Sequence, residues 1–279
     1  MTNVKGLRKG LEDKYLRLQG ILAEMQSVLI GFSGGADSTL LLKVAHDMLG
    51  DKAVAVTANS ATLELSELED AKRIAKEIGS THLIVDANEL ECKEFIKNPP
   101  DRCYHCKKIR FSLLKDIQKE HNFNWIADGT NADDEGDWRP GIKAAAEMGI
   151  RSPLKEAGLC KSDIRELSAL LGLSTWDKPS MACLASRIPY GEEINAAKLH
   201  QIAKAEKYIK ELGFRQLRVR HHGDLARIEV PKDEMDKVLK SADRIVAQLK
   251  AFGFNFISLD LSGFKSGSMN VALKNQTGL

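Results

Sequence analysis

The sequence lacks any long uninterrupted run of apolar residues, which excludes one class of protein. No segment approaches the roughly 20 apolar residues that an α-helix needs to span a bilayer. The segment 1–20 is charged throughout and has no apolar stretch of the kind found in secretory signals. We therefore expect a cytosolic protein with no membrane partner.

The sequence also has no large excess of positive or negative charge. Lysine and arginine number 41 against 39 aspartates and glutamates, so the formal net charge is only +2. This balance predicts no strong non-specific attraction to nucleic acid, and any bound anion must be held by local clusters. Apolar residues make up 43% of the 279 residues, as in ordinary globular proteins, and the length favours two domains.

Short apolar segments alternate with amphipathic segments through the first part of the chain. Strands are predicted at 28–32, 53–57, 82–85 and 124–127, with helices at 37–49, 67–78 and 102–119. This alternation predicts an α/β fold, a parallel sheet with helices on both faces. After residue 180 we expect a helix at 193–212, strands at 216–221 and 225–230, a helix at 232–252 and a strand at 256–261. The sequence thus predicts a domain of residues 1–180 and a smaller C-terminal α/β domain of residues 181–279.

A glycine-rich loop joins the first predicted strand to the next helix. It reads Ser33-Gly34-Gly35-Ala36-Asp37-Ser38, so backbone N–H groups and the positive helix end converge there as an anion cradle. The serine hydroxyls can add donors, and Asp37 can hold Mg²⁺ against phosphates. The loop has no lysine, which distinguishes it from the Walker loop. A simple glycine turn is the alternative, but the strand before it and the helix after it favour phosphate binding.

The segment Asp128-Gly129-Thr130-Asn131 follows a strand that should end near this loop. Its polar side chains could complete a metal or ribose site, so Asp128 and Gly129 are candidate nucleotide-binding residues. An acidic, solvated turn explains the composition equally well.

Five cysteines in a chain of this size favour chemistry or packing over a disulfide framework. Cys103 and Cys106 lie one turn apart at a predicted helix start, where thiolates are favoured, and Cys183 opens the second domain. Zinc binding, a redox Cys-x-x-Cys pair and an iron–sulfur cluster on three thiolates are the competing hypotheses. The phosphate loop favours the cluster, since an activated carbonyl and a sulfur source make a thiolation enzyme. Cys92 and Cys160 are predicted to be packing residues.

The motif Ser33-Gly34-Gly35-x-Asp37-Ser38 resembles the PP-loop of the ATP pyrophosphatase superfamily, which includes GMP and NAD synthetases and tRNA-thiolating enzymes. Five further segments are similar to the LarE family of sulfur transferases in nickel-pincer cofactor synthesis: 133–141, 186–191, 218–220, 224–229 and 262–267. The resemblance implies cleavage of ATP to AMP and pyrophosphate. It also implies adenylation of a carboxylate of pyridinium-3,5-biscarboxylic acid mononucleotide and its conversion to a thiocarboxylate.

The LarE family has two chemical kinds. One gives up the sulfur of a cysteine at the position of Ala182, which has no sulfur here. Cys103, Cys106 and Cys183 instead match the cluster-dependent kind, which implies a [4Fe–4S] cluster that carries sulfide. The alternative is that Cys183, next to Ala182, is itself the cysteine that gives up its sulfur. The resemblance further implies ATP and Mg²⁺ as cofactors, self-association into a homo-oligomer, and a sulfide source that is either a partner protein or free sulfide.

Several charged residues are candidates for contacts to the substrate. Arg218 and Arg220 alternate on one face of a predicted strand and suit the phosphate and carboxylates of an anionic mononucleotide, although a solvated strand face is the alternative. Arg187 is a comparable candidate for substrate binding and catalysis near Cys183. Glu206 enters as a catalytic or metal-site candidate through its family match, and Lys107 could stabilise thiolate or adenylate charge. Both Glu206 and Lys107 lie on predicted polar helices, where a charged side chain is usually exposed.

Two rival functions remain open from the sequence. A tRNA thiolase could use the same loop with a three-cysteine cluster, but the near-neutral charge disfavours a nucleic-acid partner. A zinc-stabilised nucleotide-binding protein without turnover is the rival from another class.

Overall fold

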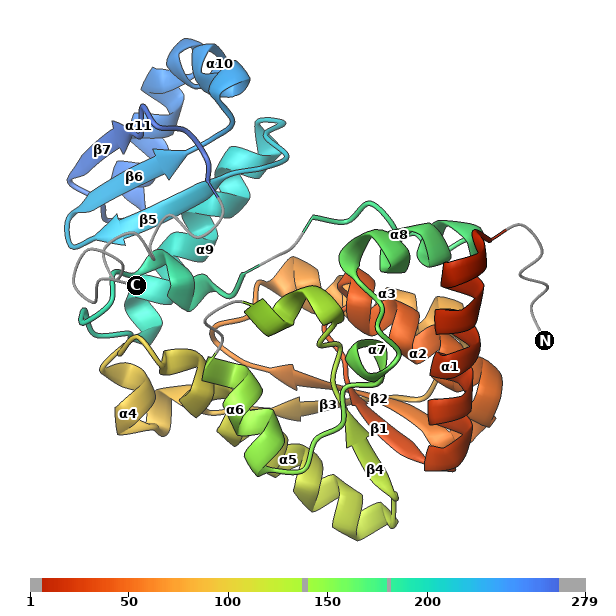
Figure 1. The fold of residues 1–279 in the computed structure, drawn as a ribbon. Helices are drawn as coiled ribbons and strands as arrows, with labels where there is room; N and C mark the ends of the chain where they lie inside the picture. The colour runs from red at the N-terminus through yellow and green to blue at the C-terminus, as the bar shows by residue number, and fades with distance from the viewer. Residues whose placement is uncertain (1–6, 137–139, 180–181, 266–279) are drawn as a thin grey trace. The chain divides into compact units, whose positions relative to one another are not determined.

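The structure is a computed structural model that describes residues 7–136, 140–179 and 182–265. It divides into two compact units (Figure 1), one of residues 1–88 and 103–181, here unit 1, and one of residues 89–102 and 182–279, here unit 2. The division predicted at residue 180 treated residues 89–102 as part of the first domain. The structure instead packs this segment with the C-terminal unit.

Unit 1 is built on a four-stranded sheet in which every pair is parallel. The strands are β1 (Val28–Gly31), β2 (Ala53–Asn59), β3 (His82–Asp86) and β4 (Trp125–Ala127), in the order β3-β2-β1-β4. The predicted parallel α/β sheet is confirmed. The chain order reverses at β1, so the loops after β1 and β4 emerge side by side, where ligands of open α/β sheets bind.

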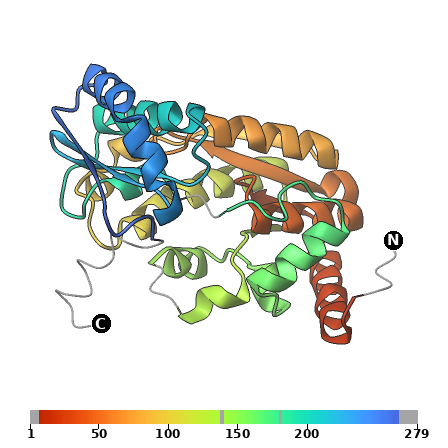
Figure 2. The same ribbon diagram turned by 90° about the horizontal axis from the view of Figure 1, so that it is seen from above.

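Helices cover both faces of this sheet. One face carries α1 (Lys9–Met25), α2 (Ala36–Leu49), α3 (Leu65–Ile78), α7 (Pro153–Glu156) and α8 (Lys161–Leu170), and the other carries α5 (Arg102–His121) and α6 (Pro140–Glu147). Leu18 and Leu22 of α1 are fully buried against the first group. Figures 1 and 2 both show α1 beside α8, and Arg8 and Lys14 contact Asp163 there. Short 3-10 turns at Gly50–Lys52 and Ala132–Gly136 complete the unit.

Unit 2 has a three-stranded sheet in the order β5-β6-β7. The strands are β5 (Arg218–His222), β6 (Leu225–Glu229) and β7 (Phe256–Leu259); β5 and β6 are antiparallel, and β6 and β7 are parallel. The helices α9 (Ala196–Glu211), α10 (Met235–Lys240) and α11 (Ala242–Ala251) share an apolar core with it. Its remaining elements are η2 (Glu89–Glu91), α4 (Lys93–Ile96), η4 (Leu184–Arg187) and η5 (Lys232–Glu234).

The single helix predicted over 232–252 is wrong. The segment is interrupted at Ser241, whose backbone leaves the helical region at φ −106° and ψ 8°. Serine competes for backbone hydrogen bonds and favours helix ends over helix interiors.

Residues 89–102 join unit 2 through buried hydrogen bonds. The fully buried Asn98 amide lies 2.7 Å from the carbonyl of Pro189 and 3.1 Å from that of Glu192. The Gly191 and Ile194 amides donate back to this segment. A buried amide with this many partners fixes the segment, although its sequence gives no sign of a distant contact.

No helix in the described part of the chain is both long and apolar enough to cross a membrane.

Candidate functional site

The glycine loop forms the predicted strand–loop–helix transition between β1 and α2. The hydroxyls of Ser33 and Ser38 lie 3.2 Å apart, and Ser38 Oγ also donates to the carbonyl of Gly35 at 3.2 Å. Gly34 has φ +66°, and a β-carbon there would lie 3.1 Å from Cα of Ala71 in α3. The loop therefore combines a left-handed glycine, close packing and a helix N-terminus, which together suit an anion.

Asp37, in the first turn of α2, meets a lysine that no sequence motif indicated. The ammonium of Lys161 forms an ion pair with the Asp37 carboxylate, and both side chains are partly exposed. The backbone N–H of Lys161 donates to Asp133 at 2.8 Å. Lys161 thus contacts Asp37 through its side chain and Asp133 through its backbone, and carboxylate oxygens are the ligands that Mg²⁺ prefers. Lys161 is 124 residues from Asp37, so no local pattern could reveal the pair.

The loop after β4 packs directly on the start of α2. A β-carbon at position 129 would lie 3.1 Å from the backbone N of Ser38 and 3.4 Å from Cβ of Asp37, so Gly129 permits this approach. The neighbouring Asp128 is buried and accepts hydrogen bonds from Ser152 at 2.8 Å and Lys107 at 2.9 Å. Burial raises the pKa of the Asp128 carboxyl, but Lys107 and these hydrogen bonds outweigh burial and lower it. Asp128 is therefore an anion in the fold.

Lys107 was expected to be exposed on the surface of its helix, but it contacts other residues of unit 1. Its alkyl chain passes over Gly141, where a β-carbon would lie 2.8 Å from Cδ of Lys107. Its ammonium reaches Asp128, and it directly follows Cys106 in α5. Unit 1 thus connects the Cys-x-x-Cys helix to the glycine loop through Lys107, Asp128 and Gly129.

A second lysine at the glycine loop also lies beyond the reach of any local motif. Lys178 Nζ donates to the carbonyl of Gly34 at 3.3 Å and to Asp70 at 2.9 Å, and it lies 3.6 Å from Glu67. Its side chain is only 16% exposed. Lys161 and Lys178 together bring cationic groups to a loop that contains no lysine of its own.

The cysteines are accessible to differing degrees. Cys103 is exposed, whereas Cys106 and Cys183 are partly exposed, and none of the five cysteines, all of which lie in the described ranges, is in a disulfide. Cys103 and Cys106 start α5 in unit 1, and Cys183 precedes η4 in unit 2, so neither unit alone carries all three thiols. Within the described residues no three His, Cys, Asp or Glu side chains gather as a metal site.

Cys92 and Cys160, predicted as packing residues, are both partly exposed and lie at helix starts. Cys160 caps α8, and its backbone N–H donates to Asp163 at 3.1 Å.

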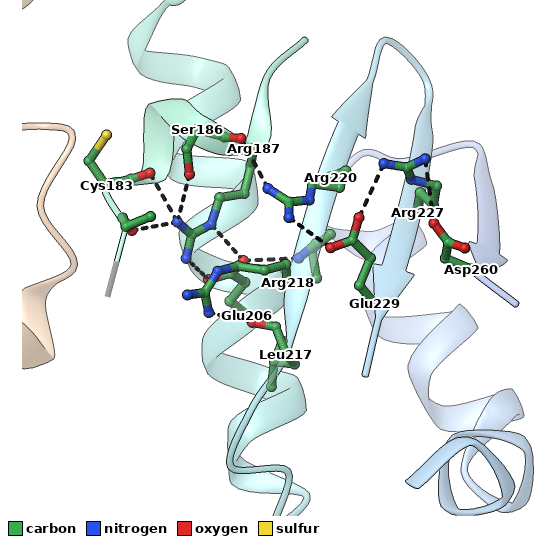
Figure 3. A network of polar contacts seen from close by, with 12 residues as sticks. Cys183, Ser186, Arg187, Glu206, Leu217, Arg218, Arg220, Arg227, Glu229 and Asp260 are labelled. Atoms are coloured by element: carbon green, nitrogen blue, oxygen red, sulfur yellow. Dashed lines mark hydrogen bonds and ion pairs between the residues drawn. The ribbon is translucent and has the colours of Figure 1, made fainter. Parts of the chain in front are cut away.

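The predicted substrate-binding arginines of unit 2 belong to a buried network (Figure 3). Arg187 and Glu206 form a two-pronged ion pair, with Nε to Oε1 at 2.9 Å and Nη2 to Oε2 at 2.8 Å. Arg220 donates to Glu229 at 2.7 Å, and the guanidinium of Arg218 lies 5.3 Å from the Phe264 ring centroid. All five charged side chains of this set are at least nine-tenths buried.

This burial corrects two expectations. Glu206 was expected at the surface of a polar helix, but it is fully buried because Arg187 and the Val219 amide satisfy its carboxylate. A solvated strand face for Arg218 and Arg220 is likewise excluded by exposures of 6% and 5%. The Arg187 side chain is 1% exposed, and two of its nitrogens are bonded to Glu206.

Comparison with known proteins decides the family. Residues 12–101 match the family model described as NAD synthase. A protein of Lactiplantibacillus plantarum named pyridinium-3,5-bisthiocarboxylic acid mononucleotide synthase is 41% identical over 264 residues, covering 94% of this chain and 96% of that protein.

The chain belongs to the LarE family.

Other relatives extend this result. An uncharacterised protein of Synechocystis is 44% identical, covering 94% of this chain and 99% of its own length. The glutamine-hydrolysing GMP synthase of Chlamydia muridarum is 28% identical, covering 62% of this chain and 35% of its own length. The prediction of an ATP-dependent sulfurtransferase of the PP-loop type is confirmed by membership of the LarE family.

Proposed function

We propose that this LarE-family chain adenylates a carboxylate of pyridinium-3,5-biscarboxylic acid mononucleotide with ATP and converts it to a thiocarboxylate, releasing AMP and pyrophosphate. The observation that carries the proposal is the 41% identity, over 94% of the chain, to a synthase named for the bisthiocarboxylic product. Similarity over nearly the whole chain includes the C-terminal unit, which is where a substrate other than ATP would be recognised.

Activation of the carboxylate is assigned to unit 1. A substrate carboxylate oxygen attacks the α-phosphorus of ATP, the bond to the β-phosphate oxygen breaks, and pyrophosphate leaves with the electron pair. The Ser33 and Ser38 hydroxyls and the N-terminus of α2 would hold the phosphates. Asp37 would hold Mg²⁺, because its carboxylate is an oxygen ligand and is partly exposed. In the structure this carboxylate pairs with the Lys161 ammonium, another cation.

Recognition of the anionic mononucleotide is assigned to unit 2. Arg218 and Arg220 are the proposed contacts to its phosphate and carboxylates, because guanidinium groups bind such oxyanions with two parallel hydrogen bonds. Burial strengthens such contacts, because the protein interior screens charge less than water does. Self-association of the chain is part of the same proposal.

The sulfur is proposed to come from sulfide that a [4Fe–4S] cluster would carry on one of its irons, with Cys103, Cys106 and Cys183 as the ligands of the cluster. The donor set fits such a group, since all three thiols are exposed or partly exposed and two lie one turn apart at the start of α5. A cluster held by three thiolates has one iron without a protein ligand, and that iron can carry an additional sulfide.

Anaerobic purification followed by iron and sulfide analysis tests this part, with intact mass measured before and after turnover. We expect iron and sulfide in the ratio of a [4Fe–4S] cluster, an unchanged protein mass and repeated turnover. Cys103→Ser should abolish the iron content, whereas the control Cys92→Ser should retain it. A protein that loses the mass of H₂S in a single turnover would instead identify Cys183 as a sacrificial donor.

Pyrophosphate release tests the adenylation itself. It should require both ATP and the carboxylate substrate, and it should persist in Cys103→Ser because activation precedes sulfur transfer. Nucleotide binding without any pyrophosphate release would overturn the proposed function.

A further inference from the structure

The backbone segment Ala182–Ser186, which carries Cys183, is held by three arginines from three different parts of unit 2. Nη1 of Arg187 lies 2.5 Å from the carbonyl oxygen of Ala182 and 2.9 Å from that of Cys183. Nη1 of Arg220 donates to the carbonyl of Ser186 at 3.1 Å (Figure 3). Nη1 of Arg102 donates to the carbonyl of Ala185, also at 3.1 Å. Four of the five carbonyls in the segment therefore accept from guanidinium groups.

Two of these arginines, Arg187 and Arg220, are held in place by a buried carboxylate. Arg187 is anchored by both oxygens of Glu206, and the same glutamate accepts the Val219 amide of β5 at 2.9 Å. Arg220 is anchored by Glu229, which is fully buried. A guanidinium fixed on one edge by a carboxylate presents its other nitrogen in a defined direction.

The third arginine is fixed without a carboxylate. Arg102 is 4% exposed, bonds to the side-chain oxygen of Asn98, and lies 5.1 Å from the ring centroid of Tyr190. Arg102 immediately precedes Cys103 in the chain. Its contacts with Ala185 and Tyr190 add to those that join residues 89–102 to unit 2.

The segment has little regular structure to hold it in place. It contains the short 3-10 turn η4, with backbone hydrogen bonds from Ser186 to Cys183 at 2.9 Å and from Ile188 to Ala185 at 3.2 Å. Short 3-10 turns have poorer hydrogen-bond geometry than α-helices, so donors from outside the turn can add to its stability.

We propose that Arg102 and Arg187 are positioning residues that, together with the contact of Arg220 to Ser186, clamp residues 182–186 and fix the direction of the Cys183 thiol. The inference rests on the proposed function in giving Cys183 a part in sulfur transfer. Arg187 then acts on the cysteine segment and not on the substrate. Arg220 joins the proposed substrate-binding strand β5 to the same segment, so thiol and substrate strand are held by one network.

The test is the double variant Arg187→Met/Glu206→Gln, which removes the donor without leaving an unpaired buried charge. The amide oxygen introduced by Glu206→Gln still accepts from the Val219 N–H. Hydrogen exchange of the Ser186 and Ile188 amides should quicken about tenfold or more, since losing even one of the charge-assisted hydrogen bonds from Arg187 has an effect of that size. Lys207→Gln is the matched control, because Lys207 is exposed on the same helix α9, and exchange should not change there.

Kinetics separate positioning from substrate binding. In the double variant the kcat for thiocarboxylate formation should fall about tenfold or more, whereas ATP–pyrophosphate exchange and its KM values should not change. Arg102→Gln, acting from a different segment, should show the same split and the same faster amide exchange.

Two results would overturn the clamp. One is unchanged exchange of the Ser186 and Ile188 amides in both variants, and the other is a parallel fall in ATP–pyrophosphate exchange, which would make Arg187 a substrate contact. If the unaltered protein shows no ATP–pyrophosphate exchange with the carboxylate substrate, the proposed function has failed. The amide exchange rates still decide the clamp in that case.

Discussion

The ion pair between Lys161 and Asp37 at the glycine loop of unit 1 is partly exposed, whereas the pair between Arg187 and Glu206 beside Cys183 in unit 2 is buried. The side chains of Lys161 and Asp37 are 44% and 23% exposed, against 1% and 0% for Arg187 and Glu206. An exposed pair contributes at most about 1 kcal/mol, so Mg²⁺ and phosphate can replace it at small cost. Breaking a buried pair costs roughly 3–5 kcal/mol. The first arrangement suits ligand exchange, and the second suits a fixed framework.

The largest effect should come from breaking the buried pair. We expect Arg187→Met to lower the free energy of unfolding by roughly 3–5 kcal/mol, because Glu206 is left charged and buried. Lys161→Met, its counterpart at the glycine loop, should cost less than about 1 kcal/mol. Urea unfolding of both variants measures the difference. Equal losses in the two variants would contradict the proposed contrast between the units.

The next effect concerns catalysis and not stability. Asp37→Asn should reduce ATP–pyrophosphate exchange about 100-fold, because the proposed Mg²⁺ ligand loses its charge. Its free energy of unfolding should change by less than about 1 kcal/mol, since the pair with Lys161 is partly exposed. Asp133→Asn is a useful comparison, because Asp133 accepts a hydrogen bond from the Lys161 backbone. Full activity in Asp37→Asn would remove Asp37 from the metal site.

The predicted features of unit 1 are those that local periodicity encodes. The strand before Ser33, the helix after it and the parallel sheet follow from apolar runs and glycines within one stretch of sequence. The Cys-x-x-Cys pair at a helix start was predicted for the same reason, since α5 begins at Arg102. Such local signals do not report which distant side chains meet.

The features that escaped prediction depend on long-range pairing. Glu206 lies on a helix that looks polar, and its burial becomes favourable only because Arg187, 19 residues away, neutralises it. Arg102 reaches a carbonyl 83 residues further along the chain. In both cases the favourable partner is invisible to helix periodicity, which scores a charged residue as exposed.

The third effect tests a buried charge in unit 1 whose partners are at the surface. Asp163 has a 1% exposed side chain, while its partners Lys14 and Arg8 are 36% and 56% exposed. Burial raises the pKa of Asp163, but hydrogen bonds from Lys14 and the Cys160 amide outweigh it and lower the pKa to about 2. Because the folded pKa lies below the unfolded value of 3.8, the stabilisation is complete above pH 3.8 and is lost as pH falls toward 2.

This linkage corresponds to roughly 2 kcal/mol. Asp163→Asn should therefore be destabilised by roughly that amount near neutral pH, and the difference from the unaltered protein should shrink below pH 3.8. Urea unfolding as a function of pH measures both. A difference that stays constant through this range would mean that Asp163 acts by shape and not by charge.

The last prediction tests how closely the glycine loop of unit 1 packs against α3. Gly34 and Gly50 both have positive φ, +66° and +58°, so an alanine at either position should cost about 1–3 kcal/mol in backbone strain. A β-carbon at Gly34 would also lie 3.1 Å from Cα of Ala71, whereas Gly50 faces open space. Gly34→Ala should therefore raise the KM for ATP, because the loop must shift away from α3. Gly50→Ala should keep the KM unchanged, and equal KM values in the two variants would show that contact with α3 does not shape the phosphate loop.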